Sequence, residues 1–260
     1  SGVISDFTAT KAIVRVLLYK VCKNMVFKPN IVVCMPSTVT NLEKRTILDL
    51  VTAAGAGRAC LIEEPLAAAL GAGLDIRRPM GTMVVDIGGG TADIAVVTMG
   101  SISISKSVKI AGNILDEDII RYLRRERNIV IGEKTAESIK KRIGCAYLRD
   151  TELAIGIKGK HYITGMPITD EVNTTEVYLA MREHLEAIAE GVRSVLEVTP
   201  PELAGDISET GILLTGGGAL LRGLDKLIAA ETRIPVLVAE SPLDCVVDGT
   251  GICLEHPLDK

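Results

Sequence analysis

Hydrophobic and polar positions along this chain switch repeatedly between the period of a helix and the short apolar runs of a buried strand. In the first 80 residues the pattern predicts helices at 7–23, 40–54 and 65–73, and strands at 30–36 and 59–64. Thr40 and Glu43 have the spacing of a capping box, which marks the start of the second helix. Strands that alternate with helices in this way indicate an α/β fold.

From residue 81 on, the order of elements changes. The pattern predicts a strand meander at 82–110, helices at 115–127 and 135–147, a small irregular or β insert at 148–172, a long helix at 173–198, strands at 211–215 and 235–239, and helices at 216–232 and 242–255. The two halves match if the first half has lost an opening meander. We therefore expect two similar α/β domains, 1–80 and 81–260, with the chain beginning partway through the first.

The composition is that of a folded protein without extreme charge. The chain has 260 residues, is 47% hydrophobic and carries a formal net charge of −4. A slightly acidic chain argues weakly against a general nucleic-acid binder, for which a basic face is typical. No uncharged stretch is long enough to span a bilayer, and no secretory signal opens the chain. The cysteines lack metal-ligand spacing, so we expect reduced thiols and a cytoplasmic location.

A turn of three glycines carries the first sign of chemistry. The stretch VVDIGGGTADIAVV (84–97) contains the GGGT turn, formed by Gly88, Gly89, Gly90 and Thr91. It is neither a P-loop, since no lysine follows, nor a dinucleotide-binding turn, since position 93 is Asp93. A bare turn lets backbone N–H groups converge on an anion, and Asp86 before it could hold a hydrated Mg²⁺. A tight hairpin with left-handed glycines is the structural alternative.

A second glycine turn follows in GILLTGGGALLRGL (211–224), where Gly216, Gly217 and Gly218 separate a strand from a helical pattern. Free N–H groups at a helix start attract phosphate. A simple strand-to-helix turn needs one glycine rather than three. Two such turns in one chain predict two walls that close on one nucleotide.

Six motifs in order resemble the MreB/Mbl family of bacterial actin-like cell-shape proteins. They are IVVCMPSTVTNLEKR, LIEEPLAAALGAGL, MVVDIGGGTADIAVV, IGEKTAESIKKRIG, TPPELAGDI and GILLTGGGALLRGLDKL. The resemblance covers nearly the whole chain and implies an actin-like (ribonuclease H-like) two-domain ATPase fold, with the first domain incomplete. It also implies ATP and Mg²⁺ between the halves, filaments of identical subunits at the inner face of the cell membrane, and a role with the cell-wall elongation machinery in cell shape and peptidoglycan synthesis.

The resemblance further implies roles for single residues. Glu64 matches the carboxylate that orients the attacking water, and its neighbour Glu63 is the weaker choice. The GGGT turn would hold the β- and γ-phosphates. Glu137 and Lys140 match adenosine-contacting positions, although by themselves they would be an ordinary surface ion pair. The wall beside adenine and ribose corresponds to Gly216, Gly217, Gly218, Ala219 and Leu220.

Two surface features have open interpretations. Met25, Val26 and Phe27 form an apolar loop between lysines, which in the family dips into the bilayer; a loop folded back onto the core is the alternative. The basic run Arg121, Arg124, Arg125 and Arg127 is interpreted as a solvated helix face, with a partner site as the alternative.

Three other readings of the sequence remain. A small-molecule kinase of the same fold needs a second substrate pocket, for which we find no motif. A chaperone-type ATPase should continue into a peptide-binding domain, whereas this sequence stops at Lys260. A gene fragment is the third, because the opening phosphate hairpin of the family has no counterpart in this sequence. We therefore expect this chain alone to hydrolyse ATP poorly.

Overall fold

The computed structural model describes residues 6–23, 27–148 and 150–256. Its elements in chain order are α1 (Phe7–Val21), β1 (Asn30–Met35), α2 (Asn41–Ala54), β2 (Arg58–Glu63), α3 (Glu64–Gly71), β3 (Thr82–Ile87), β4 (Ala92–Thr98), β5 (Ser101–Val108), α4 (Gly112–Arg127), β6 (Ile129–Val130), α5 (Glu133–Ile143), β7 (Ala154–His161), β8 (Pro167–Asn173), α6 (Thr174–Val198), α7 (Pro201–Thr210), β9 (Ile212–Thr215), η1 (Gly217–Leu220), α8 (Leu224–Thr232), β10 (Val236–Val238) and α9 (Cys245–Glu255). In the described ranges no helix combines the length and the apolar character that a membrane crossing requires.

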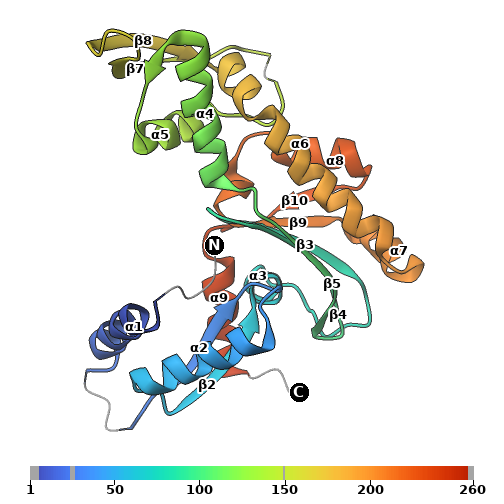
Figure 1. Cartoon of the computed structure of the whole chain (residues 1–260). Coiled ribbons are helices and arrows are strands. Elements are labelled where there is room, and N and C mark those ends of the chain that lie inside the picture. The colour runs from blue at the N-terminus through green and yellow to red at the C-terminus, as the bar shows by residue number, and fades with distance from the viewer. Residues whose placement is uncertain (1–5, 24–26, 149, 257–260) are drawn as a thin grey trace.

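The strands form three sheets. β1 and β2 are a parallel pair. The central sheet has the order β10-β9-β3-β4-β5, in which β3 runs antiparallel to β4 and parallel to β9. β6, β7 and β8 form a small antiparallel sheet. Figure 1 shows the β1–β2 pair with α1 and α2 at one end of the molecule, the central sheet in the middle, and the β7–β8 hairpin at the other end.

One unit of topology occurs twice. A parallel strand pair with a helical crossover, followed by a helix, is formed by β1–α2–β2 and α3, and again by β9–α8–β10 and α9. In the second unit β9 also pairs with β3 of the meander, whereas in the described part of the chain β1 pairs with β2 only. The repeated topology is the one that the element order of the sequence predicts.

The two units meet where α3 packs on α9. A Cβ atom at Gly71 would overlap the carbonyl oxygen of Cys245, and one at Gly249 would overlap that of Ala67. The two helix backbones are therefore in direct contact. Ile62 of β2 and Val84 of β3 join the apolar core around this crossing, so one core connects both units.

Most predicted elements are confirmed; the differences concern β6, which was not predicted, and α5, α7 and the segment after β9. The predicted capping box at Thr40 forms, and a second capping box forms at Asn173. α5 ends at Ile143 rather than at residue 147. α7 was not predicted from the sequence. The helix predicted from residue 216 is instead the short 3₁₀ turn η1 followed by α8, because Gly223 adopts a left-handed conformation between them.

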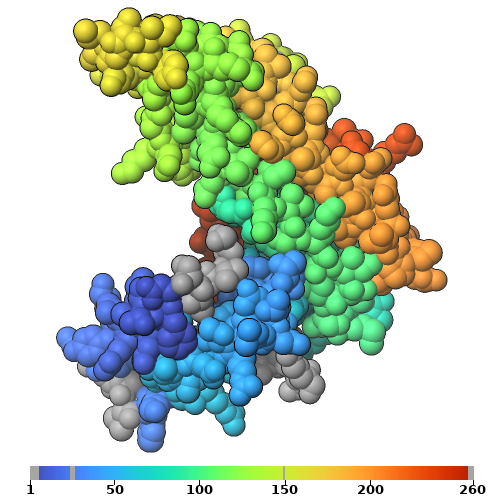
Figure 2. Space-filling model, viewed as in Figure 1, coloured from blue at the N-terminus to red at the C-terminus, as the bar shows by residue number. Residues whose placement is uncertain are grey.

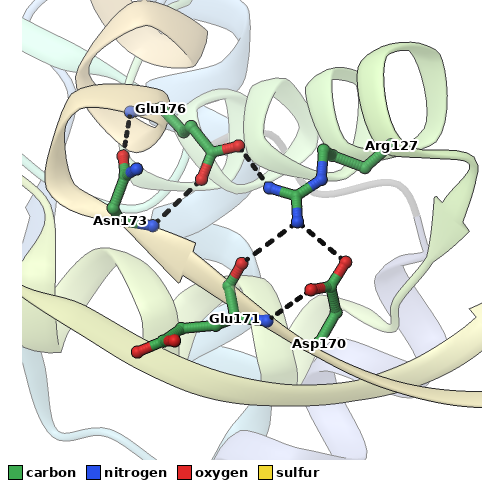
Figure 3. A network of polar contacts seen from close by, with 5 residues as sticks. All are labelled: Arg127, Asp170, Glu171, Asn173 and Glu176. Carbon is green, nitrogen blue, oxygen red and sulfur yellow. Dashed lines mark hydrogen bonds and ion pairs between the residues drawn. The ribbon is translucent and has the colours of Figure 1, made fainter.

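Arg127 is a structural residue, so the interpretation of the basic run as a solvated face is wrong for this position. Its guanidinium donates to the carboxylates of Glu176 at 2.6 Å and Asp170 at 2.8 Å, and to the carbonyl oxygen of Glu171 (Figure 3). Glu176 also completes the capping box with Asn173. The network fixes the end of α4 to β8 and to the first turn of α6.

Gly249→Ala should lower the free energy of unfolding by about 1–3 kcal/mol, because the added methyl group forces α3 and α9 apart. Gly251→Ala is the matched control on the same helix, since a Cβ there meets nothing within 4 Å. It should stabilise the protein by up to about 1 kcal/mol, because alanine favours the helix more than glycine does. Chemical denaturation compares the two variants, and equal stabilities would contradict the direct backbone contact.

Candidate functional site

The GGGT turn connects β3 to β4 and rests on the first turn of α4. The N–H of Gly112 donates to the carbonyl oxygen of Gly88 at 3.2 Å, and the N–H of Asn113 donates to that of Gly89 at 2.8 Å. In a trans peptide the N–H points opposite to the C=O, so the N–H groups of Gly89 and Gly90 point away from α4. α4 thus orients two turn N–H groups toward the side from which an anion can approach.

The glycines of this turn are not explained by backbone strain. None of Gly88, Gly89 and Gly90 has a positive φ, so the alternative of left-handed hairpin glycines is wrong. A Cβ at Gly88 would meet only the carbonyl oxygen of Thr91, at an ordinary contact distance of 3.7 Å. The chain itself leaves room for a side chain there, and the glycines are exposed. The bare turn therefore keeps space for something outside the chain.

The second glycine turn has a different cause. Gly216 has a φ of +77°, and a Cβ there would overlap the carbonyl oxygen of Ile87. A Cβ at Gly218 would overlap the Ile87 side chain. Packing against β3 thus requires two of the three glycines, contrary to the expectation of one. The turn leads into η1 rather than into an α-helix, so the expected helix N-terminus does not lie at these glycines.

The predicted wall beside adenine and ribose is only partly accessible. Ala219 is buried in the core, so its side chain is unavailable to a ligand. Leu220 is 59% exposed, and Gly217 is exposed next to Leu243. Leu220 and Gly217 are the exposed residues of this segment, and Gly216 and Gly218 are partly buried.

Three carboxylates interact near the GGGT-turn end of β3 and β4. Asp86 and Asp93 are opposite each other on β3 and β4, and Asp86 accepts a hydrogen bond from Thr215 Oγ1 at 3.0 Å. Burial, together with the negative charges of Asp93 and Asp86, raises the pKa of Glu64 to about 7. Burial also raises the pKa of Asp86, which the Thr215 hydrogen bond opposes. The negative charge of Asp93 therefore disfavours the charged forms of Glu64 and Asp86.

Asp93 is a site residue that sequence reasoning missed. Its side chain is 1% exposed, and in the described structure its Oδ1 atom has no hydrogen-bond partner. A buried carboxylate oxygen in this state favours a cation or an ordered water nearby. The described residues contain no group of three or more His, Cys, Asp or Glu arranged to hold a metal ion by themselves. The available signal was the place of Asp93 directly across the hairpin from Asp86.

The structure distinguishes Glu64 from Glu63. Glu63 forms an ion pair with Lys44 at 3.3 Å. Glu64 opens α3 with its carboxylate among the acids of β3 and β4. Of the two neighbours, Glu64 is the one whose charge interacts with the rest of the site.

Glu137 and Lys140 do not pair with each other, so their interpretation as one surface ion pair is wrong. Glu137 pairs with Lys141 at 2.6 Å, and this hydrogen bond lowers the pKa of Glu137. Lys140 Nζ lies 2.9 Å from Asp116 Oδ1 on α4 and donates to the carbonyl oxygen of Gly112 at 2.6 Å. Glu137 is exposed, whereas Lys140 is engaged within the protein.

Met25 and Val26 of the apolar loop lie outside the described residues. Phe27 is 83% exposed, so its ring does not fold back onto the core. α1 beside the loop has no buried residue. Its outward face carries exposed Ile13, Val16 and Leu17 at a spacing that aligns them along the helix. The apolar surface therefore extends beyond the predicted loop.

Two hollows lie on the C-terminal half of α4. One, of about 500 Å³, is lined by Arg121, Arg124, Arg125, Asn128 and Tyr162. The other, of about 410 Å³, lies between α4 and α6. The GGGT turn contacts the opposite end of α4, so neither hollow belongs to the glycine-turn site. Figure 2 shows the surface indented between the part formed by α1 and α2 and the part formed by α4 and α5.

Comparison with known proteins gives consistent relatives. The family model described as MreB/Mbl protein matches residues 1–259. Cell shape-determining protein Mbl of Bacillus subtilis is 45% identical over 260 residues, which is 100% of this chain and 78% of that protein. Cell shape-determining protein MreB of Escherichia coli is 46% identical over 256 residues, which is 98% of this chain and 74% of that protein.

Solved structures of MreB and of a filament protein are similar to this chain as well. MreB5 of Spiroplasma citri bound to ADP superposes with a TM-score of 0.92 at 38% identity, covering 97% of this chain and 76% of that one. A MamK double helical filament, at 19% identity and a TM-score of 0.81, shares the fold. The fold is therefore actin-like, and the chain belongs to the MreB/Mbl family.

Proposed function

We propose that this protein binds ATP with Mg²⁺ at the GGGT turn and assembles with copies of itself into filaments that direct cell shape and wall synthesis. The observation that carries the proposal is the GGGT turn, whose N–H groups are aimed outward and in which the protein's own packing leaves room for a side chain at Gly88. Relatives named for cell shape, and MreB5 structures bound to ADP and to AMPPNP, support it. They favour it over a small-molecule kinase or a chaperone-type ATPase.

The phosphates are held by the N–H groups of Gly89 and Gly90 and by the hydroxyl of Thr91. Donors fixed in advance by α4 need no rearrangement when an anion arrives. Leu220 and the Gly217 backbone line the nucleoside side, together with Glu137 on α5. These residues come from the two glycine turns and one helix, and therefore enclose the nucleotide from different directions.

Asp86 is the residue that would hold Mg²⁺ through water. Mg²⁺ keeps several waters and is usually bound by one or two carboxylates plus substrate phosphates, so the absence of a dedicated protein cage fits it. The unpartnered Oδ1 of Asp93 is a further acceptor for such a hydrated ion. When bound, the cation neutralises phosphate charge and lowers the mutual repulsion of the carboxylates.

Glu64 is the carboxylate that orients the attacking water in ATP hydrolysis. Phosphoryl transfer depends mainly on positioning and charge stabilisation, so an acceptor at a fixed place is what the reaction requires. The carboxylate accepts a hydrogen bond from water at both oxygens only when it is ionised. A pKa of about 7 keeps it close to that transition.

The protein attaches to a membrane surface through the loop at 25–27 and the outward face of α1. Exposed Phe27 and the aligned Ile13, Val16 and Leu17 supply apolar area. Lys20 and Lys23 beside them favour anionic lipid. The attachment proposed here is peripheral, at the inner face of the cell membrane, and each protomer of a filament would add to it.

Gly88→Ala should weaken binding of a fluorescent ATP analogue by about tenfold or more, because its methyl group occupies phosphate space. ATP-dependent pelleting should fall with it. The variant should keep its unfolding temperature, since its Cβ contacts only Thr91. Gly218→Ala is the contrasting variant, which should lose stability because its Cβ overlaps Ile87. A folded Gly88→Ala protein with wild-type affinity would mean that the phosphates bind elsewhere.

Stability of the nucleotide-free, metal-free protein should decrease between pH 5 and pH 8 because of Glu64. Its folded-state pKa of about 7 lies above the unfolded value of 4.5, so the folded state binds more protons in this range. Stability then falls as pH rises. Denaturation of wild type and Glu64→Gln at several pH values isolates this contribution, and the slope should be shallower in the variant. Identical slopes would show that Glu64 has an ordinary pKa.

Flotation with anionic liposomes tests the membrane proposal. Wild type should float, and a variant with Met25, Val26 and Phe27 all changed to Ser should float much less, because the apolar contact is lost. Ile163→Ser removes an equally exposed apolar residue from the β7–β8 turn and is the control. Equal flotation of all three proteins would show that the loop does not contribute to membrane attachment.

A further inference from the structure

Lys140 and Asp116 form an ion pair that is shielded from solvent. The Nζ and Oδ1 atoms are 2.9 Å apart, and each side chain is 13% exposed. Burial raises the pKa of Asp116, and its interaction with Lys140 opposes this effect. Removing one partner alone would leave a largely buried charge without compensation. The pair thus joins α4 and α5 strongly.

Gly112 connects this pair to the GGGT turn. Its carbonyl oxygen accepts the hydrogen bond from Lys140 Nζ at 2.6 Å, while its N–H donates to the carbonyl oxygen of Gly88. The position that a Cβ at Gly112 would take is 3.4 Å from both Lys140 Nζ and Gly88 O. The ammonium, the first turn of α4 and the GGGT turn therefore converge on one point.

The ammonium group of Lys140 already has two partners within the protein. One of its three donors serves the carbonyl oxygen of Gly112, and the group lies 2.9 Å from Asp116 Oδ1 as an ion pair. A lysine held in this way is poorly placed to leave for a ligand, although its position in the sequence matches an adenosine contact of the family. Its bonds act instead on the peptide that fixes the direction of the turn N–H groups.

We propose that Lys140 is a positioning residue for the phosphate-binding turn, with Asp116 as its partner in that role. The proposal rests on the proposed function, because it presumes that the GGGT turn receives the phosphates. Lys140 holds the Gly112 carbonyl, Gly112 and Asn113 hold the carbonyls of Gly88 and Gly89, and the opposite N–H groups face the phosphate. Phosphate affinity then depends on a residue that does not contact phosphate.

The test compares adenine nucleotides of different phosphate length. Lys140→Met should weaken ATP and ADP binding by about tenfold, and AMP binding by less than about twofold, in competition with a fluorescent ATP analogue. Asp116→Asn should show the same selective loss, although Asp116 touches no part of the proposed nucleotide site. The variant that combines Lys140→Met with Asp116→Asn should bind ATP and ADP no more weakly than Lys140→Met alone, because both changes break the same connection. It also leaves no buried unpaired charge, so it stays informative if a single variant unfolds.

Hydrogen exchange supplies a second readout that needs no nucleotide. The amides of Gly112 and Asn113 should exchange faster in Lys140→Met and in the double variant than in wild type, because their acceptors in the turn become mobile. Lys134→Met, at an exposed position on the same helix, should change neither exchange nor affinity.

The outcomes distinguish failure of the Lys140 inference from failure of the proposed nucleotide binding. An equal loss for ATP, ADP and AMP, with Asp116→Asn unaffected, would make Lys140 a nucleoside contact and overturn the inference. Unchanged exchange at Gly112 and Asn113 would overturn it as well. A wild-type protein that binds no nucleotide would instead overturn the proposed function, while the exchange measurement would still decide whether Lys140 positions the turn.

Discussion

The direct backbone contact of α3 with α9 is the constraint on which the site depends. α3 begins at Glu64, so the crossing fixes where that carboxylate lies. The segment before α9 also touches the second glycine turn, since the N–H of Gly216 donates to the carbonyl oxygen of Pro242 at 2.8 Å. Only glycine at 71 and 249 allows this approach. One helix crossing therefore sets the positions of the water-orienting candidate and of one nucleotide wall together.

The carboxylates show a conflict between folding and function. Glu64, Asp86 and Asp93 lie close enough to raise the pKa of Glu64 and Asp86, and Asp93 retains an oxygen without a partner in the described structure. A fold selected for stability alone would place apolar or paired groups there. Such arrangements are typical of functional sites, where a bound cation or substrate compensates the charge.

Local signals in the sequence predicted much of the fold. The capping box at Thr40 and the apolar strand runs depend on neighbouring residues, and the structure confirms them. α7 was missed because half of its sequence, PELAGDISET, is polar and it buries only Ile207. Its register is set by tertiary contacts, such as the hydrogen bond from the Gly81 N–H to Asp206.

The candidate site was predictable in its parts but not in its connections. The two glycine turns look alike in sequence, yet packing explains Gly216 and Gly218 and does not explain Gly88. Lys140 and Asp116 are on different helices, so no local pattern relates them. The choice of Glu64 over Glu63 came from the resemblance to the MreB/Mbl family. The structure adds a physical reason, because the charges of Asp86 and Asp93 act on Glu64, whereas Glu63 forms an ion pair with Lys44.

The most direct test of the account is the response of the backbone amides to Mg²⁺ and ATP in isotope-labelled protein followed by NMR. The account predicts saturable shifts that are largest at the amides of Gly89, Gly90 and Thr91, because these groups face the phosphates. With ADP in place of ATP, the chemical-shift changes should be smaller but should occur at the same residues. Saturable binding with an unchanged GGGT turn, and shifts confined to Arg121, Arg124 and Tyr162 around the hollow on α4, would contradict it.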